Sequence, residues 1–279
     1  MLKLYAIDLD GTLFYPKHPR KILSNKTVNL LQRIVDSGDF FVAVSGRTLT
    51  SCKTVFTKID REPHIIACNG SCILVKDELI FDKYFESETV HKILDYVHTN
   101  YKTIGCYVMD KDGRLILKNK FRTFMQRFGQ KMYDLSRGNL LDKYIISEDS
   151  FNEAIKNNRV YKIMIMFGVF KKAKLRAKEA NKDLQQKFGD ICSSCWSEQM
   201  VEISPFGCDK SNGIKMVANH LGVKNEDIIV VGDSGNDIPM FKAFFENSYC
   251  ISRAPSTVRK YAKHNVKNVN KLLEQAMGK

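Results

Sequence analysis

A chain of 279 residues with 44% hydrophobic and 27% charged residues has the composition of a globular protein, and its length favours two domains over one. No apolar stretch approaches the roughly 20 residues that span a bilayer, and the early acidic residues are not typical of a signal peptide, so we expect a cytoplasmic protein without a membrane partner. The net charge of +13 suits an anionic partner but does not choose among nucleic acid, acidic membranes and phosphorylated small molecules.

The cysteines and the densest basic run do not by themselves indicate a function. Eight cysteines spread over the whole chain favour reduced thiols over a disulfide framework. Cys192 and Cys195 form a CxxC pair, but no second pair follows at zinc-site spacing, so two ordinary thiols are favoured over a metal or redox site. The basic run at 171–182 indicates a solvated helix face before it indicates a binding patch.

The first part of the chain alternates strand and helix patterns. Residues 3–9 form a short apolar run, and Ser24 is placed to cap a helix that Gly38 would end. Two further apolar runs follow at 40–44 and 64–68. Continuous apolar strands with helices between them are typical of a parallel sheet that is covered on both faces.

The middle of the chain has a different pattern. Residues 84–196 mix helices with alternating strands, and Asp112 and Gly113 between two strand-like runs predict an antiparallel hairpin. Residues 227–231 then form another buried-strand run, after a helix that ends at Gly222. We therefore expect an α/β core domain formed by residues 1–83 and 197–279, with residues 84–196 as an inserted α+β domain.

Acidic side chains follow two of the predicted core strands. Asp8 and Asp10 lie two positions apart, so they would face the same side of a strand. Two carboxylates so close should not both ionise easily, which predicts an ionised nucleophile beside a protonated acid. Gly11 allows a sharp turn, Thr12 is able to anchor it, and Asp233 follows the late strand. Two such turns at the ends of parallel strands predict a site for a divalent cation and a phosphate.

At this point the chain resembles a known family. DLDGTL, which begins at Asp8, is similar to the first motif of the haloacid dehalogenase superfamily, in its aspartate-nucleophile phosphatase branch. Ser45-Gly46-Arg47 resembles the second motif, Lys210 the third, and GDSGND, which contains Asp233 and Asp237, the fourth. The position, size and α+β pattern of the insert resemble the C2-type cap of Cof-type (class IIB) members, whose core is Rossmann-like. The Asn69-Gly70 element is also similar to that subfamily.

The resemblance implies a role for each matching residue. Asp8 would attack phosphorus, and Asp10 would act as the acid and then the base. Mg²⁺ would be held by Asp8, the Asp10 carbonyl and Asp233. The remaining residues would bind the phosphoryl group or support those that do: Leu9, Ser45, Gly46, Lys210 and Asn236 as phosphate ligands, with Thr12, Arg47, Ser234 and Asp237 in support. Asp237 would orient Lys210 or a metal-bound water, and Arg47 would either touch substrate or cap or form a structural salt bridge.

The chain departs from the family pattern at two places. Ser211 replaces a common glycine after Lys210, which predicts a stiffer loop. Ser252, Arg253 and Ala254 stand where the family often has Gly-Asn-Ala, so the approach of this loop to the site is open.

The sequence therefore predicts a Mg²⁺-dependent phosphatase that acts on a small phosphorylated metabolite, such as a sugar phosphate, through an aspartyl-phosphate. A sugar phosphomutase of the same fold is the nearest alternative. A non-catalytic nucleic-acid-binding protein is the alternative from another class, motivated by the net charge of +13. The set of Asp8, Asp10, Lys210 and Asp233 argues against it, because binding alone would not require these residues. The sequence indicates neither the physiological substrate nor an oligomeric state.

Overall fold

The computed structural model describes residues 2–15, 22–110, 114–117, 143–157, 159–168, 171–197 and 199–278. The chain divides into two units, one formed by Met1–Asp82 with Asp209–Lys279 and the other by Lys83–Cys208. The first unit is built on a largely parallel sheet and the second on a largely antiparallel one. The predicted fold class, an α/β core with an inserted α+β unit, is confirmed.

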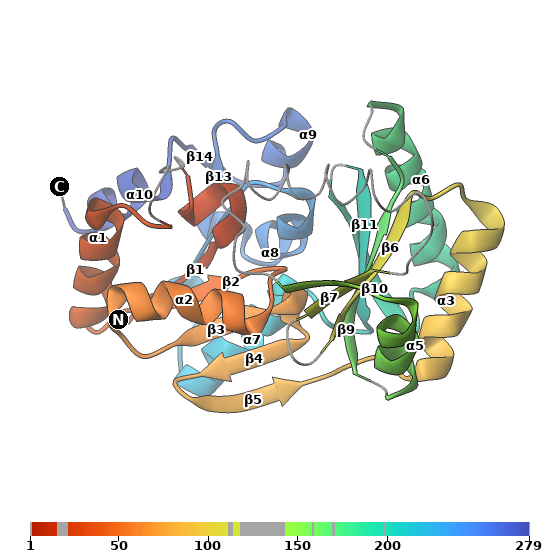
Figure 1. Ribbon diagram of the computed structural model, residues 1–279. Coiled ribbons are helices and arrows are strands. Elements are labelled where there is room, and N and C mark those ends of the chain that lie inside the picture. The colour runs from red at the N-terminus through yellow and green to blue at the C-terminus, as the bar shows by residue number, and fades with distance from the viewer. Residues whose placement is uncertain are drawn as a thin grey trace. The chain divides into compact units, whose positions relative to one another are not determined.

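The sheet of the first unit places the N-terminal strand between the two strands that precede the predicted motifs. Its order is β14-β13-β12-β1-β2-β3-β4-β5, and the strands from β14 to β3 run parallel (Figure 1). The antiparallel strands β4 and β5 complete one edge. The strand bounds are β1 Leu4–Asp8, β2 Phe40–Val44, β3 His64–Ala67, β4 Cys72–Val75, β5 Glu78–Asp82, β12 Ile228–Gly232, β13 Ser248–Ile251 and β14 His264–Val266.

Helices cover both faces of this sheet, which is why every residue of β1 is buried. On one face, apolar residues of α7, α8 and α9 join a core cluster with Leu4 and Val42. On the opposite face, the ring of Phe56 in α2 stacks on the ring of Phe41, with the ring centroids 5.2 Å apart. The predicted cap at Ser24 is confirmed, since its side chain accepts a hydrogen bond from the Thr27 amide. The helix bounds are α1 Asn25–Asp36, α2 Leu49–Ile59, α7 Lys210–Leu221, α8 Ile238–Ala243, α9 Ser256–Arg259 and α10 Val269–Ala276.

The second unit has its own sheet, in the order β10-β11-β9-β6-β7-β8. All neighbours pair antiparallel except β7 and β8. The predicted hairpin corresponds to β6 and β7, whereas its turn at Asp112 and Gly113 lies outside the described residues. The strand bounds are β6 Gly105–Asp110, β7 Arg114–Leu117, β8 Lys143–Ile146, β9 Val160–Met166, β10 Cys192–Ser197 and β11 Met200–Pro205.

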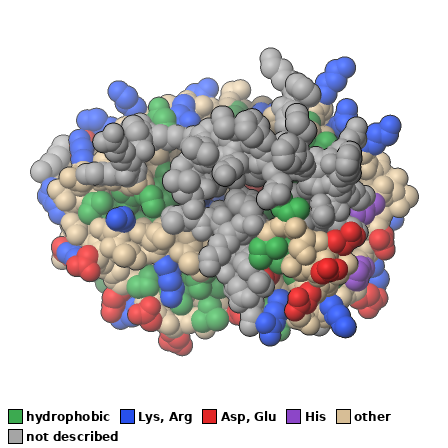
Figure 2. All heavy atoms as spheres, in the orientation of Figure 1, with side chains coloured by type: hydrophobic (Ala, Val, Ile, Leu, Met, Phe, Trp, Pro, Cys, Tyr) green, Lys and Arg blue, Asp and Glu red, His purple; other side chains and the backbone are tan. Residues whose placement is uncertain are grey.

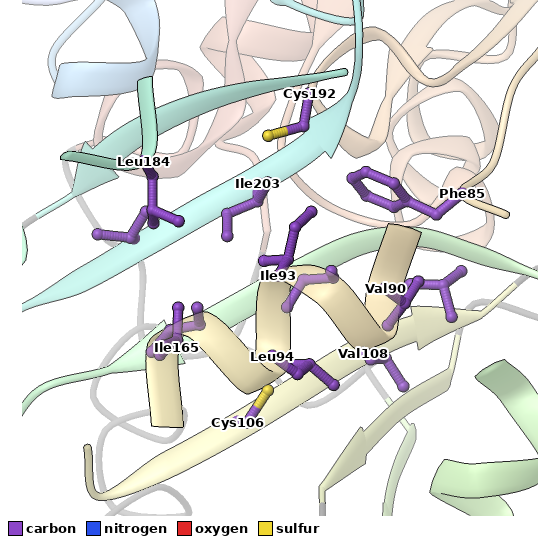
Figure 3. Close-up of a cluster of buried hydrophobic side chains, with 14 of the residues drawn as sticks. Phe85, Val90, Ile93, Leu94, Cys106, Val108, Ile165, Leu184, Cys192 and Ile203 are labelled. Atoms are coloured by element: carbon purple, nitrogen blue, oxygen red, sulfur yellow. The ribbon is translucent and has the colours of Figure 1, made fainter. Parts of the chain in front are cut away.

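Helices α3 (Ser87–Asn100), α5 (Glu148–Lys156) and α6 (Lys171–Phe188) supply apolar side chains to the core of this unit. Figure 3 shows Ile93 and Leu94 of α3 among side chains from β6, β9 and β11. Each of these strands places alternate residues in the cluster, because successive side chains of a strand point to opposite faces. Val108 of β6, Ile165 of β9 and Ile203 of β11 are examples. The unit therefore has a hydrophobic core of its own.

The boundary of the insert differs from the expected one. The sequence pattern predicted that the core domain resumes at residue 197. In the structure, β11 pairs with β9 and β10 inside the second unit, which extends to Cys208. Trp196 lies in β10 opposite Val201 of β11. A strand pattern does not reveal which sheet a strand joins, because its partners lie far away in the sequence.

The remaining features of the chain match ordinary structural roles. The basic run lies on α6, where Ala177 and Leu184 are buried and Arg176 and Lys178 are exposed, as a solvated helix face requires. On the face drawn in Figure 2, Lys and Arg side chains lie in several separate places. Cys192 and Cys195 are free thiols three positions apart in β10, so they point to opposite faces. Within the described residues, no helix is both long and apolar enough to cross a membrane.

Candidate active site

The predicted site residues follow neighbouring central strands, at the carboxyl ends of the parallel sheet. β1 ends at Asp8, β12 ends just before Asp233, and the two strands pair side by side in parallel. β2 flanks β1 on the other side and leads into Ser45. Since parallel strands end at the same edge, this register brings together three segments that are distant in the sequence.

The loop after β1 packs directly on the Asp233 carboxylate. Gly11 has a φ of +79°, and a Cβ there would lie 2.3 Å from Asp233 Oδ2, so this position excludes side chains on both grounds. Thr12 donates its hydroxyl proton to Asp233 Oδ1 at 2.9 Å. The Gly-Thr pair thus lets the loop approach Asp233 and then anchors it there. The sequence predicted a sharp turn at Gly11 and an anchoring hydroxyl at Thr12, but not that Asp233 is the partner.

The Asp233 carboxylate lies in a cluster of three carboxylates. Asp8, Asp233 and Asp237 each offer an oxygen, and these oxygens lie within 4.8 Å of one another. Lys210 Nζ lies 2.6 Å from Asp8 Oδ1 and 2.6 Å from Asp237 Oδ1. The second oxygen of Asp8, Oδ2, is buried and has no hydrogen-bond partner among the described residues. An unpartnered buried carboxylate oxygen beside two further carboxylates is suited to a hard cation, which prefers oxygen ligands.

Local structure fixes the positions of Lys210 and Asp237. Lys210 is the first residue of α7, and the side chain of Asp209 caps that helix by accepting from the amides of Ser211 and Asn212. Asp237 Oδ2 accepts from the amides of Asp233 and Ser234, both at 2.8 Å. Its other oxygen accepts from Lys210, which is one of the two contacts that the resemblance implied for Asp237.

Burial dominates the electrostatics of the cluster. It raises the pKa of Asp8 well above its usual range, against the Lys210 ammonium, and Asp237 and Asp233 raise it further. Burial opposes the charged form of Lys210, but the carboxylates of Asp237 and Asp8 outweigh it and raise the pKa of this amine. Burial and Asp237 raise the pKa of Asp233 to about 6, although Thr12 and Arg253 oppose them. A divalent cation would relieve this crowding of negative charge.

Asp10 does not behave as the strand-based argument predicted. β1 ends at Asp8, and Asp10 lies in the following turn with φ −76° and ψ 116°, so the same-face rule for strands does not apply to the pair. Both Asp10 oxygens instead accept from Arg47, at 2.6 Å from Nε and 2.7 Å from Nη2. The premise that Asp8 and Asp10 share one face of a strand is therefore wrong, whereas the ionised and protonated states expected of the pair remain predictions.

The other predicted residues lie in the same loops with local partners. Ser45 is buried, and its hydroxyl accepts from the Arg47 amide at 3.1 Å. Gly46 is half-buried between these two residues. Leu9 is buried at the start of the turn. The Asn236 side chain accepts from the Ser234 hydroxyl at 2.5 Å. Their predicted contacts with a phosphoryl group remain predictions.

Two residues outside the predicted set contact it directly. Asn69 accepts from Asn236 Nδ2 at 3.3 Å and adopts a left-handed conformation with a φ of 57°. Arg253 donates to the Gly11 carbonyl at 2.8 Å and lies 3.8 Å from Asp233 Oδ2. The Asn-Gly pair after a buried strand was a usable signal for Asn69. Nothing in the sequence indicated that Arg253 contacts the site; its segment was noted only because it departs from the family's Gly-Asn-Ala pattern.

Comparison with known proteins places this geometry in a family. The family model described as haloacid dehalogenase-like hydrolase matches residues 5–272. The chain is 24% identical over 274 residues to 5-amino-6-(5-phospho-D-ribitylamino)uracil phosphatase YbjI of Escherichia coli, covering 97% of this chain and 92% of that protein.

Solved structures show the same fold, inserted unit included. The structure of SMU.1108c from Streptococcus mutans aligns over 100% of both chains with a TM-score of 0.83 and 16% identity. A structure described as a subclass IIB sugar phosphatase of the haloacid dehalogenase superfamily aligns over 99% of both chains with a TM-score of 0.74 and 18% identity. The predicted resemblance to the haloacid dehalogenase family is confirmed, and the fold, inserted unit included, is that of a class IIB structure.

Proposed function

Since the chain belongs to the haloacid dehalogenase-like hydrolase family, we propose that it hydrolyses phosphate monoesters of small metabolites with the help of a bound Mg²⁺. The observation that carries this proposal is the buried Oδ2 of Asp8, which has no hydrogen-bond partner in the described part of the chain and lies in the cluster with Asp233, Asp237 and Lys210. A nucleophile must keep one oxygen available, and Lys210 holds the other oxygen and thereby fixes the direction of attack.

Asp8 is the proposed nucleophile. Its Oδ2 forms a bond to phosphorus while the bond from phosphorus to the leaving oxygen breaks, which yields an aspartyl-phosphate. Asp10 donates a proton to the leaving oxygen, and it later takes a proton from the water that hydrolyses the acyl phosphate. Because both oxygens of Asp10 accept from Arg47, this role requires one oxygen to release the guanidinium and take up a proton when substrate binds, while the other keeps its contact and holds Asp10 in position.

The cluster of Asp8, Asp233 and Asp237 oxygens is suited to a hard cation such as Mg²⁺. The proposed protein ligands are Asp8, the Asp10 carbonyl and Asp233. The bound cation would reduce the repulsion between the phosphate dianion and the carboxylates. Lys210 would add charge stabilisation for the phosphoryl oxygens, with the Leu9 and Gly46 amides, Ser45 and Asn236 as further donors. Asp237 would hold Lys210 in place, and Thr12 would hold Asp233.

The proposed substrate class is a small phosphorylated metabolite, such as a sugar phosphate or a related organophosphate. The Escherichia coli relative named above is a phosphatase of a phosphorylated ribitylaminouracil, which belongs to the same broad class. The two-unit architecture supports the proposal, since caps of this kind exclude bulk water and select the leaving group.

The decisive experiment replaces Asp8 by asparagine, which keeps the size but removes the nucleophile. We expect Asp8→Asn to lower hydrolysis of p-nitrophenyl phosphate in Mg²⁺ by several orders of magnitude, whereas Asp82→Asn, at an exposed position, should leave the rate unchanged. Near-normal activity of Asp8→Asn would exclude the covalent mechanism. Isomerisation of hexose monophosphates without release of inorganic phosphate would show that the activity is that of a phosphomutase and not that of a hydrolase.

A further inference from the structure

Arg253 reaches the carboxylate cluster from a firmly held turn. This turn follows β13, where Ser252 donates its amide proton to the Val266 carbonyl at 2.8 Å and Ala254 donates to the Ile251 carbonyl at 2.9 Å. Ala254 is also buried. The backbone on either side of Arg253 is therefore fixed, and the direction of its side chain is set by the contacts of the guanidinium.

The guanidinium of Arg253 joins three parts of the site. Nη2 donates to the Gly11 carbonyl at 2.8 Å and lies 3.8 Å from Asp233 Oδ2. The guanidinium carbon lies 3.9 Å from the centre of the Tyr15 ring, within the range of a cation–π contact. A single cation thus contacts Gly11 and Tyr15, both in the segment after β1, and lies beside a candidate ligand of the metal.

The charges around the cluster show what this cation does. The four carboxylates of Asp8, Asp10, Asp233 and Asp237 face three cations. Arg47 pairs with Asp10, and Lys210 pairs with both Asp8 and Asp237. Arg253 is the cation of these three that lies beside Asp233. A divalent cation on Asp233 would compete with Arg253 for the same carboxylate and would be repelled by it.

We propose that Arg253 is a positioning residue that holds the loop after β1 against Asp233 when no metal is bound and lowers the affinity of the site for divalent cations. The cation site belongs to the proposed function, so the inference rests on it. The physical consequence is a site whose negative charge is largely, though not fully, compensated before the metal enters, and from which the metal dissociates more readily.

The test measures binding of Mg²⁺ alone by titration calorimetry, without substrate. Because the Arg253 side chain is 45% exposed, solvent weakens its effect, and we expect Arg253→Gln to bind Mg²⁺ about threefold to tenfold more tightly than the wild type. Arg253→Lys keeps the charge and should stay close to the wild type. The control is Arg61→Gln, which removes another arginine–carboxylate pair, with Asp36, at the opposite end of the sheet before β3.

Thermal unfolding of each variant with and without Mg²⁺ provides a second readout and shows whether the variants are folded. The rise in melting temperature on adding Mg²⁺ should be larger for Arg253→Gln than for the wild type. Unchanged or weaker Mg²⁺ binding by Arg253→Gln, or equal binding by the Gln and Lys variants, would overturn the inference alone. Absence of Mg²⁺ binding to the wild-type protein would overturn both the inference and the proposed function.

Discussion

Lys210 Nζ lies 2.6 Å from Asp8 Oδ1 although 202 positions separate the two residues in the chain. The same ammonium lies 2.6 Å from Asp237 Oδ1, and none of the three side chains is more than 5% exposed. Lys210 is therefore the counter-ion that allows two carboxylates to be buried together. Several predictions about stability and activity depend on this and neighbouring contacts.

Replacement of Lys210 by methionine should damage stability as well as activity. The change keeps most of the side-chain volume but leaves Asp8 and Asp237 buried without their cation, which typically costs about 3–5 kcal/mol. We expect Lys210→Met to lower the urea midpoint of unfolding and to reduce phosphatase activity at least about a hundredfold. Lys215→Met, at an exposed position of the same helix, is the control. A variant as stable as the wild type would show that the ion pair does not support the fold.

Arg47 should affect catalysis through the orientation of Asp10. Without the bidentate contact at 2.6 and 2.7 Å, the Asp10 carboxylate loses the group that fixes its position. We expect Arg47→Met to lower kcat on the order of tenfold to a hundredfold, the usual cost of a misplaced catalytic group. Arg47→Lys should recover little of this loss, because an ammonium does not reproduce a planar fork. Steady-state kinetics with p-nitrophenyl phosphate measure the kcat of each variant. An unchanged kcat of Arg47→Met would contradict the positioning role.

A methyl group at Gly11 should displace the loop from Asp233. Gly11 and Gly222 both have positive φ, +79° and +69°, but only at Gly11 would a Cβ collide with neighbouring atoms, at 2.3 Å from Asp233 Oδ2. Both alanine variants should lose about 1–2 kcal/mol of unfolding free energy from backbone strain. Gly11→Ala alone should also lose most of its activity and Mg²⁺ affinity. Equal activities of the two variants would show that the close approach of the loop is dispensable.

His64 should make the protein less stable in mild acid. Burial lowers its pKa to about 4, below the usual value of about 6.5, and its Nδ1 has no hydrogen-bond partner among the described residues. The unfolded chain therefore binds a proton between these values that the folded chain does not. The contribution of neutral His64 is complete above about pH 6.5 and falls towards pH 4, by at most about 3 kcal/mol.

Urea unfolding at pH 7 and pH 5 measures this effect. His64→Phe, whose ring would still pack on Phe40, should lose less stability between the two pH values than the wild type does. His91→Gln, at an exposed position, should retain the wild-type pH dependence. An identical acid sensitivity of the wild type and His64→Phe would assign the effect to other groups.

The candidate site divides into residues that local patterns could locate and contacts that they could not. Asp8 and Asp233 were predicted together because each follows a buried strand, and such strands end at a common edge when they run parallel. The bond between Asp10 and Arg47 escaped prediction, because the side chain of a residue past the strand end points where the turn dihedrals direct it. Arg253 escaped it as well, since its turn carries no motif and only the packing of β13 beside β12 brings it near Gly11.

The amino-acid sequence alone determined the order of strands and helices, the two acidic turns and the presence of an insert, because hydrophobic period, glycine and capping residues act over a few positions. Only the tertiary structure decided that β11 belongs to the sheet of the insert, that Lys210 joins Asp8 to Asp237, and that Arg47 and Arg253 pair with acidic residues of the site. Strand partners and ion pairs depend on which distant segments meet, and that is settled by the packing of the whole chain.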